Sequence, residues 1–370
     1  MVAVGVALIG SVPAVIDALP GPDSQVSATI LLDRIGRSHD QAYSGQVRTR
    51  GTIPLPVTKG FTDLADLVGG TTSLRVWWRS RDEWRVDRLV PAGETDLVHS
   101  GVLIQEWDFE SRRLSMSRDP MVRLPRTADL LPPVLATRLL RGATSAEVSR
   151  LPTLVIAGHP APGLRLIPAD ARSSIARVDV WADEATGLPL AVEVTADGER
   201  APSIESRFQA VDLSLPEQRL LAFRHPPGTE TTFDEVIDLA DAADQYADER
   251  SPKTLVGLPR VPTGAGAVGI YGGGVTSLIA IPVWYRAADP LREQLAVTPG
   301  VLIRHGWQTL QAGPLGLVLT DPHLVVAEDG DTYPSSWLVT GTVDARTLLA
   351  AAAELDRGVG LGTRSGREVR

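Results

Sequence analysis

The sequence predicts an α+β protein in two parts: an unclosed antiparallel β-barrel wrapped around helices, and a smaller α+β domain at the C-terminal end. Five short extended segments lie between Thr71 and Met116 with only turn formers between them, so they must pair as antiparallel neighbours. A second series of extended segments lies between Glu147 and Val211. An open sheet of roughly ten strands twists and curls, and its concave side can then accommodate helices.

The first series of strands alternates between apolar and more polar positions. In an extended segment Leu74, Val76 and Trp78 lie on one face, and the residues between them lie on the other. This alternation predicts a sheet with one apolar face and one wetter face. The predicted strands of this series are Thr71 to Trp78, Trp84 to Val90, Thr95 to Leu103, Glu106 to Phe109 and Arg112 to Met116.

Other elements of the first domain precede and follow this series. Ser27 can cap a helix that runs to about His39. Residues 43–51 predict a first strand, and Gly142 can end a short helix from Val134 to Arg141. The second series of strands is expected at Glu147 to Ala157, Gly163 to Ile167, Ile175 to Ala182, Pro189 to Thr195 and Ser203 to Val211. We therefore place the curled-sheet domain at residues 27–228.

The first residues, Met1 to Ile16, carry no charge. As a helix they span about 24 Å, less than the roughly 30 Å hydrocarbon core of a membrane. The segment is similar to the apolar region of a secretory signal but lacks the positively charged lead-in. We expect residues 1–26 to be a signal-like or anchor-like segment with a spacer, which indicates an extracytoplasmic protein. A misplaced start codon, or a buried element of the folded domain, would also fit.

The stretch from Thr229 to Pro262 is acidic, with a local net charge of −5 in a chain of net charge −9. Thr232 and Glu235 have the spacing of a capping box, so residues 229–254 are expected to contain a linker helix. Residues 255–360 predict the small α+β domain, and residues 361–370 predict a tail. The expected elements of this domain are strands at Thr276 to Pro282, Gly313 to Thr320 and Trp337 to Val343, and a helix that starts after Asp344.

Charge and composition exclude several classes of function. The tryptophan-rich strands mix arginines with carboxylates and form no basic stripe, which argues against nucleic-acid binding. Cysteine is absent, which excludes disulfides, thiol catalysis, cysteine-ligated metals and lipidation at a cysteine.

No motif in the sequence indicates catalysis. Residues 264–269 match the dinucleotide fingerprint as text, but a proline-broken loop precedes them and more glycines follow where a helix is needed. We interpret them as a glycine-rich turn within a sheet. The six histidines are scattered singly, no Gly-x-Ser-x-Gly elbow occurs, and Asp179, Asp183 and Glu184 are more simply solvated than paired for glycosidase chemistry. We expect no enzyme, no cofactor and no metal site.

Tryptophan is the residue type that allows a functional interpretation. Aromatic side chains cover a pleated face well, so packing in the core is the simpler account. Alternatively, some of these side chains line an apolar cavity under the curled sheet that would suit an acyl chain or an apolar peptide. The residues we assign to that cavity are Val76, Trp78, Trp84, Val86, Trp107, Val180, Val192 and Phe208.

The first domain resembles the LolA-like superfamily of lipoprotein carriers and lipid-binding proteins. Within it, the chain is most similar to the two-domain sigma-E regulators of the RseB/MucB group and their actinobacterial relatives. The resemblance covers about residues 27–228, and the C-terminal part is similar, less closely, to an extra domain of some actinobacterial members. The segments that carry it are Ala42 to Gly45, Leu74 to Trp78, Glu83 to Asp87, Val178 to Trp181, Thr186 to Pro189 and Phe223 to Gly228.

The resemblance implies a non-enzymatic extracytoplasmic protein with a hydrophobic cavity. Members of the RseB-like group bind the extracytoplasmic domain of a membrane anti-sigma factor and sense lipid, whereas carriers hold the acyl chains of lipoproteins. We expect a regulatory or sensor protein, with a lipid or lipoprotein carrier of the cell envelope as the alternative. The missing lipidation cysteine argues against a lipoprotein of the mycobacterial lipid-carrier type. The identity of the lipid and partner, the oligomeric state and the role of the acidic linker stay open.

Overall fold

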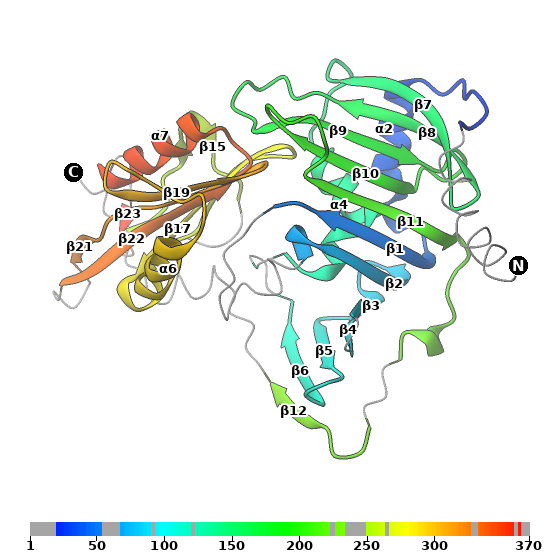
Figure 1. Cartoon of the computed structure of the whole chain (residues 1–370), viewed down its shortest axis with the longest axis horizontal. Coiled ribbons are helices and arrows are strands. Elements are labelled where there is room, and N and C mark those ends of the chain that lie inside the picture. Colours follow the sequence, from blue (N-terminus) through cyan, green and yellow to red (C-terminus); the bar gives the residue numbers. More distant parts are fainter. Residues whose placement is uncertain are drawn as a thin grey trace, which may run out of the picture.

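The computed structural model describes residues 20–53, 67–90, 93–119, 123, 125–222, 226–233, 249–262, 266–326, 332–358 and 362–363. Two sheets dominate these residues (Figure 1). The expected apolar segment at residues 1–16, most of the acidic stretch and the tail lie outside the described residues, apart from residues 362–363.

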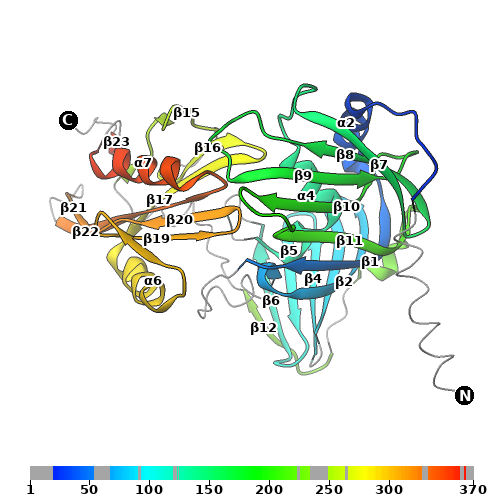
Figure 2. The same ribbon diagram turned by 45° about the horizontal axis from the view of Figure 1, so that its top comes forward.

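The first sheet has twelve strands in the order β12-β6-β5-β4-β3-β2-β1-β11-β10-β9-β8-β7. All neighbours are antiparallel except β12 and β6, which are parallel. The sheet curls without closing (Figures 1 and 2). Its strands are β1 (Tyr43–Gly51), β2 (Thr71–Ser80), β3 (Glu83–Val90), β4 (Gly93–Ser100), β5 (Leu103–Asp108), β6 (Arg113–Arg118), β7 (Val148–Ile156), β8 (His159–Leu166), β9 (Ile175–Ala182), β10 (Pro189–Ala196), β11 (Ile204–Asp212) and β12 (Glu230–Phe233).

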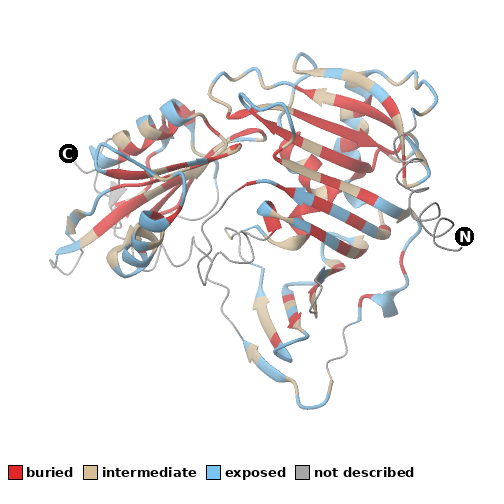
Figure 3. Cartoon of the chain, viewed as in Figure 1, coloured by how far each residue is buried: buried red, intermediate tan, exposed pale blue. Residues whose placement is uncertain are grey.

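Helices α2 (Ala28–Arg37) and α4 (Pro132–Leu139) cover one face of this sheet, which we call the inner face. Ser27 caps α2 as expected, because its hydroxyl accepts a hydrogen bond from the backbone N–H of Ile30. The apolar side of each helix packs on strands β8 to β10, and those strands are buried along most of their length (Figure 3). Short 3₁₀ turns lie at Ser38–Asp40, Thr127–Leu130 and Gln218–Leu220.

The second domain has a seven-stranded sheet in the order β16-β17-β22-β20-β19-β18, with β21 paired to β22. Helices α7 (Ala345–Asp356) and α6 (Tyr285–Val297) lie on opposite sides of it (Figure 2). Asp344 caps α7 as the sequence predicts, accepting from the N–H of Thr347 at 2.8 Å. The strands are β16 (Gly269–Gly273), β17 (Thr276–Trp284), β18 (Leu302–Arg304), β19 (Trp307–Ala312), β20 (Leu315–Leu319), β21 (His323–Val326) and β22 (Thr332–Gly341). Two small pairs complete it: β13 (Glu249–Arg250) with β23 (Gly362–Thr363), and β14 (Thr254–Leu255) with β15 (Leu258–Pro259).

Two expectations need correction, at Gly101 and at the aspartates Asp179 and Asp183. The strand expected at Thr95 to Leu103 ends at Ser100, because Gly101 takes a positive φ of 64° and turns the chain into β5. The linker helix expected in residues 229–254, with its cap at Thr232, would fall on residues 234–248, which lie outside the described residues, and Glu230–Phe233 before it is strand β12. Asp179 and Asp183 are buried rather than solvated, because Arg165 binds the first and Thr186 the second.

The second domain also contains elements that the sequence did not indicate. Helix α6 has Pro290 in its interior and begins without a side-chain cap. The sequence therefore shows neither a clear start signal nor an uninterrupted helical pattern for it. The glycine-rich residues that resemble a dinucleotide fingerprint lead into β16 and a hairpin, with Gly272 and Gly274 at positive φ. A strand in the place of the required helix removes the basis for a nucleotide site.

The two domains are joined by backbone hydrogen bonds. Residues 172–174 run beside residues 342–344: the N–H of Ser174 donates to the carbonyl of Thr342, and the N–H of Asp344 donates to that of Arg172. An apolar cluster crosses the same boundary, with Ile53 and Leu130 from the first domain and Leu310 from the second. A shared core and a shared strand pairing hold the domains in one orientation.

None of the helices in the described part of the chain has both the length and the apolar character needed to cross a membrane.

Candidate functional site: an aromatic row on the inner face

A row of aromatic rings crosses five adjacent strands on the inner face of the first sheet. Antiparallel register places Tyr43 opposite Trp78, Trp78 opposite Trp84, and Trp84 opposite His99. The Tyr43 and Trp78 rings stack with centroids 5.9 Å apart, and those of Trp78 and Trp84 stack at 5.5 Å. Phe208 meets Tyr43 edge to face at 5.7 Å. We call these five residues the aromatic row.

The row belongs to one apolar cluster but is not sealed along its whole length. Tyr43 and Phe208 are almost fully buried, whereas Trp78 is half-buried. Each aromatic pair adds about 0.5–1.5 kcal/mol to the burial of its area. The row is therefore a rigid apolar wall, and Trp78 is the member of it that a ligand can reach.

Tyr43 carries a polar group with no partner in this wall. Its hydroxyl is buried, with no hydrogen-bond partner among the described residues. Burial raises the pKa of Tyr43 well above the ordinary value, so the phenol is neutral. A buried hydroxyl without a partner costs about 1–3 kcal/mol. The hydroxyl is therefore a buried donor that no group among the described residues satisfies.

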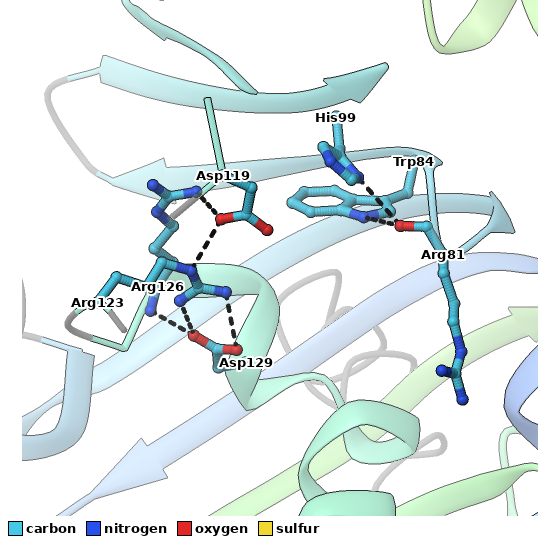
Figure 4. Close-up of polar contacts among 7 residues, drawn as sticks. All are labelled: Arg81, Trp84, His99, Asp119, Arg123, Arg126 and Asp129. Carbon is cyan, nitrogen blue, oxygen red and sulfur yellow. Dashed lines mark hydrogen bonds and ion pairs between the residues drawn. The ribbon is translucent and has the colours of Figure 1, made fainter. Parts of the chain in front are cut away.

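The other end of the row is fixed by one carbonyl oxygen. The indole N–H of Trp84 donates to the carbonyl of Arg81 at 3.1 Å, and Nδ1 of His99 lies 3.0 Å from the same oxygen (Figure 4). Because a carbonyl oxygen only accepts, Nδ1 of His99 must carry the proton. In the neutral ring Nε2 is then an acceptor.

A network of charges stands beside this end of the row (Figure 4). Arg123 donates to Asp129 at 2.6 Å and to Asp119 at 3.1 Å, and Arg126 donates to Asp119 at 3.0 Å. Burial works against ionisation of Asp129, but the hydrogen bonds and charge of Arg123 lower its pKa. This network fixes the chain that leads into α4.

The structure separates the eight residues predicted to line a cavity into three groups. Five lie together on the inner face in the cluster that contains the aromatic row: Val76, Trp78, Trp84, Val86 and Phe208. Val180 and Val192 lie on the same face but under helices α2 and α4. Ile104 pairs with His99 on the inner face, and Trp107 pairs with Asp96. Trp107 is three positions after Ile104, and successive residues of a strand alternate between the two faces. Trp107 therefore lies on the outer face of the sheet.

The outer face carries a cluster of three carboxylates on β3 and β4. Oxygens of Asp87, Glu94 and Asp96 lie within 4.8 Å of one another. Arg85 donates to Asp87 at 2.6 Å and to Asp96 at 2.8 Å, while Arg75 contacts Glu94. Burial and the nearby Asp87 carboxylate raise the pKa of Asp96 to about 8. With two guanidinium groups and a retained proton, the three carboxylates are already neutralised without a metal ion.

Sequence reasoning missed two members of the row. His99 was interpreted as an ordinary polar residue, and Tyr43 was noted only as part of the first strand. Both lie on the same face of the sheet as Trp78, and the alternation of side chains along their strands is the signal that could have found them. Using it requires the register of β1 against β2 and of β4 against β3, which pairs residues that are far apart along the chain.

No protein-family model matches this chain, and no curated protein matches it. Solved structures do match. The complex of MucA and MucB from Pseudomonas aeruginosa is 15% identical, with a TM-score of 0.48 over 91% of this chain and 98% of that chain. MucB by itself is 15% identical, with a TM-score of 0.47 over 93% of this chain and 100% of that chain. A LolA superfamily protein from Nitrosomonas europaea is 13% identical, with a TM-score of 0.25 over 54% of this chain and 98% of that chain. These likenesses concern the fold alone.

Proposed function

We propose that this chain is a non-enzymatic, extracytoplasmic regulatory or sensor protein. Its second domain binds a protein partner, and the inner face of its first domain binds an acyl chain. The extracytoplasmic domain of a membrane anti-sigma factor is the class of partner that the sequence resemblance implies. The observation that carries the proposal is the exposed apolar surface on the second domain, which the junction holds in a fixed position beside the first.

Exposed apolar residues of the second domain lie on two short strands, β18 at the end of the strand order and β21 beside β22. Ile303 on β18 is 64% exposed and Leu324 on β21 is 73% exposed, and their strands carry further exposed apolar residues, Leu302 and Val326. In the described part of the chain, β18 pairs only with β19. Soluble proteins usually protect such strand edges with charges or a covering segment. An extended peptide that adds to a sheet edge gains backbone hydrogen bonds and apolar contacts together.

The inner face supports the lipid part of the proposal. The aromatic row presents a flat apolar wall, and Trp78 is its half-buried member. The ring of Tyr43, whose hydroxyl has no partner among the described residues, stacks on Trp78. An amphiphile with an acyl chain and one acceptor group would bury apolar area against the row and satisfy that hydroxyl.

A lipid or lipoprotein carrier is the second candidate, and the aromatic row favours it equally. The second domain distinguishes the regulator from the carrier. A carrier needs the inner face only, whereas a regulator also needs the exposed strands of the second domain.

The experiment that tests the proposal measures binding of the full chain to immobilised extracytoplasmic domains of membrane anti-sigma factors from the same source. Leu302→Asp with Ile303→Asp is expected to weaken binding at least tenfold, because both charges enter the apolar edge. Leu215→Asp, an equally exposed apolar position in the first domain, is the control and should bind normally. Binding that the double variant leaves unchanged would contradict the assignment to β18.

The lipid part has its own test. Mass spectrometry of an organic extract from protein purified without detergent is expected to show stoichiometric lipid. Trp78→Asp should abolish binding of a fluorescent fatty acid while the second domain stays folded. The matched control is Trp77→Asp, because Trp77 is also half-buried but lies on the outer face. Lipid binding without partner binding would favour the carrier.

A further inference from the structure

A cavity of about 600 Å³ opens at the end of the first sheet, beyond the aromatic row. It is lined by the turns β2–β3 and β4–β5 and by the end of β6, with Asp82, His99, Gly101, Val102, Arg118 and Asp119 as its residues. The N–H of Gly101 donates to the carbonyl of Asp82 at 2.8 Å, which fixes the two turns to each other. The volume falls within the range of small-molecule sites, roughly 300–1,000 Å³.

Two opposite charges line this cavity without pairing. Within the described residues, neither the carboxylate of Asp82 nor the guanidinium of Arg118 makes an ion pair, and both side chains are exposed. Asp82 precedes β3 and Arg118 ends β6, so three strand spacings, about 14 Å along the sheet, separate their backbones. That separation keeps the two side chains apart and leaves both charges available to a ligand.

The third charge of the lining is already neutralised. Oδ1 of Asp119 accepts from Arg123 and from Arg126 (Figure 4). Asp82 is therefore the carboxylate of this cavity that a cationic group can pair with.

The fourth polar group is an acceptor with a fixed direction. His99 is 7% exposed, and its ring is held between a tilted contact with the Trp84 ring and the hydrogen bond to the carbonyl of Arg81. With the proton on Nδ1, Nε2 is the free acceptor. Asp82 is in the turn that precedes β3 and His99 is on the neighbouring strand β4, so both acceptors stand at one end of the cavity and the guanidinium of Arg118 at the other.

We propose that this cavity binds a small zwitterion in which a primary ammonium group and an oxyanion are separated by a few bonds, as in phosphoethanolamine. The ammonium group donates to Asp82 and to Nε2 of His99, and the oxyanion accepts from Arg118. The same chemistry occurs in a phosphatidylethanolamine headgroup and in the free compound. The site shares His99 with the aromatic row, but its two charged residues, Asp82 and Arg118, lie outside the row and outside β18. Substitutions at these two residues therefore test the site separately from the proposed function.

The test is a calorimetric titration of the full chain with glycerophosphoethanolamine. Ethylammonium and glycerol phosphate serve as the two halves of the ligand. The zwitterion is expected to bind at least tenfold more tightly than either half, because only it pairs with both charges. Glycerophosphocholine is expected to bind at least tenfold more weakly, since its quaternary ammonium has no N–H to donate to His99. Equal binding of the choline compound, or no binding of the ethanolamine compound at millimolar concentration, would overturn the proposal.

Variants locate the site. Asp82→Asn and Arg118→Gln are each expected to weaken binding of glycerophosphoethanolamine at least tenfold, and both positions are exposed, so the fold should be retained. The matched controls, Asp197→Asn and Arg48→Gln, remove the same charges at exposed positions elsewhere and should change nothing. Loss of binding in the controls as well would show that net charge, and not this cavity, is responsible.

Short-chain phosphatidylethanolamine, used below its micelle concentration, separates the two sources. Binding at least tenfold tighter than that of the glycerol compound identifies a lipid headgroup. Equal binding identifies the free zwitterion.

Discussion

The two faces of the first sheet are buried by different means. On β2 and β3 the inner face places Val76 and Val86 in an apolar cluster, with neither side chain exposed. On the outer face of the same strands, Asp87 is equally buried, but Arg75 and Arg85 surround it. The expected wetter face is thus charged without being wet. On the inner face, burial of apolar area stabilises the buried side chains. On the outer face, arginines and carboxylates can be buried because they form ion pairs with each other.

The outer arrangement continues across the rest of the sheet. Arg165 binds both oxygens of Asp179 at 2.7 Å, and Arg50 contacts Glu205 at 2.7 Å. A bidentate guanidinium–carboxylate pair has strict geometry, whereas apolar packing tolerates substitutions of similar volume. The stability that the outer face contributes should therefore depend on residue identity and on pH. The stability that the inner face contributes should depend on side-chain volume.

The largest effect is expected on the inner face. Phe208→Ala should lower the free energy of unfolding by about 3–5 kcal/mol, because Phe208 is fully buried and its ring supports Tyr43. Urea denaturation measures the change. Phe208→Leu keeps most of the volume and should cost less than about 1.5 kcal/mol. Equal losses in both variants would show that ring stacking, and not volume, dominates.

On the outer face, Arg85→Met should lower the free energy of unfolding by about 3 kcal/mol, since it leaves Asp87 buried without its closest partner. Arg48→Met, at an exposed outer-face position, is the control and should stay within about 0.5 kcal/mol of the parent. The same urea titration compares them. A loss below 1 kcal/mol, or one matched by the control, would mean that the buried pair is not specific.

The faces should also differ in their response to pH. Asp96 has a pKa of about 8 in the folded protein, above the roughly 3.9 of an unfolded aspartate. The folded state therefore holds the proton more tightly, and this contribution is complete below about pH 4 and is lost as the pH rises through about 8.

Asp96→Asn keeps the neutral form at every pH. Its stability relative to the parent should rise between pH 5 and pH 9, measured by thermal denaturation in matched buffers. Phe208→Leu, on the inner face, should show no such trend. A constant difference between Asp96→Asn and the parent would argue against a protonated Asp96.

The smallest effect is expected for Tyr43→Phe. Removing a buried hydroxyl that has no partner should leave the protein unchanged or stabilise it by up to about 1 kcal/mol. Chemical denaturation of ligand-free protein measures this. The same substitution should weaken lipid binding if the hydroxyl contacts the ligand. A destabilised, ligand-free variant would indicate that the hydroxyl is satisfied in solution.

Much of the first domain could be predicted from local patterns. The strand at residues 43–51, the strand at 175–182 and the cap at Ser27 agree with their expected positions, because each depends on alternation or capping within a few residues. The turn at Gly101 was wrong, since a lone glycine within an apolar run does not by itself indicate a hairpin. Without that turn the register of β5 against β4 was not available, and Trp107 was assigned to the wrong face.

The charged clusters could not be predicted at all. Asp87 and Arg85 are two residues apart and look like an exposed pair, and only the register of β2, β3 and β4 brings Arg75, Glu94 and Asp96 beside them. Helix α6 was missed because Pro290 and an uncapped start remove the usual local signals, and packing against β17 and β22 supplies its stability.

The pairing of β1 with β11 has a consequence for how the molecule folds. Strands β2 to β6 form one run of hairpins and β7 to β11 another, and each run closes over short loops. The seam between them joins Ser44 to Asp212, so it requires closure of most of the first domain. Local hairpins form in microseconds, whereas such long-range pairing is slow. During synthesis, one edge of β1 must therefore stay unpaired until β11 emerges. In that interval the chain is most exposed to aggregation and most in need of a chaperone.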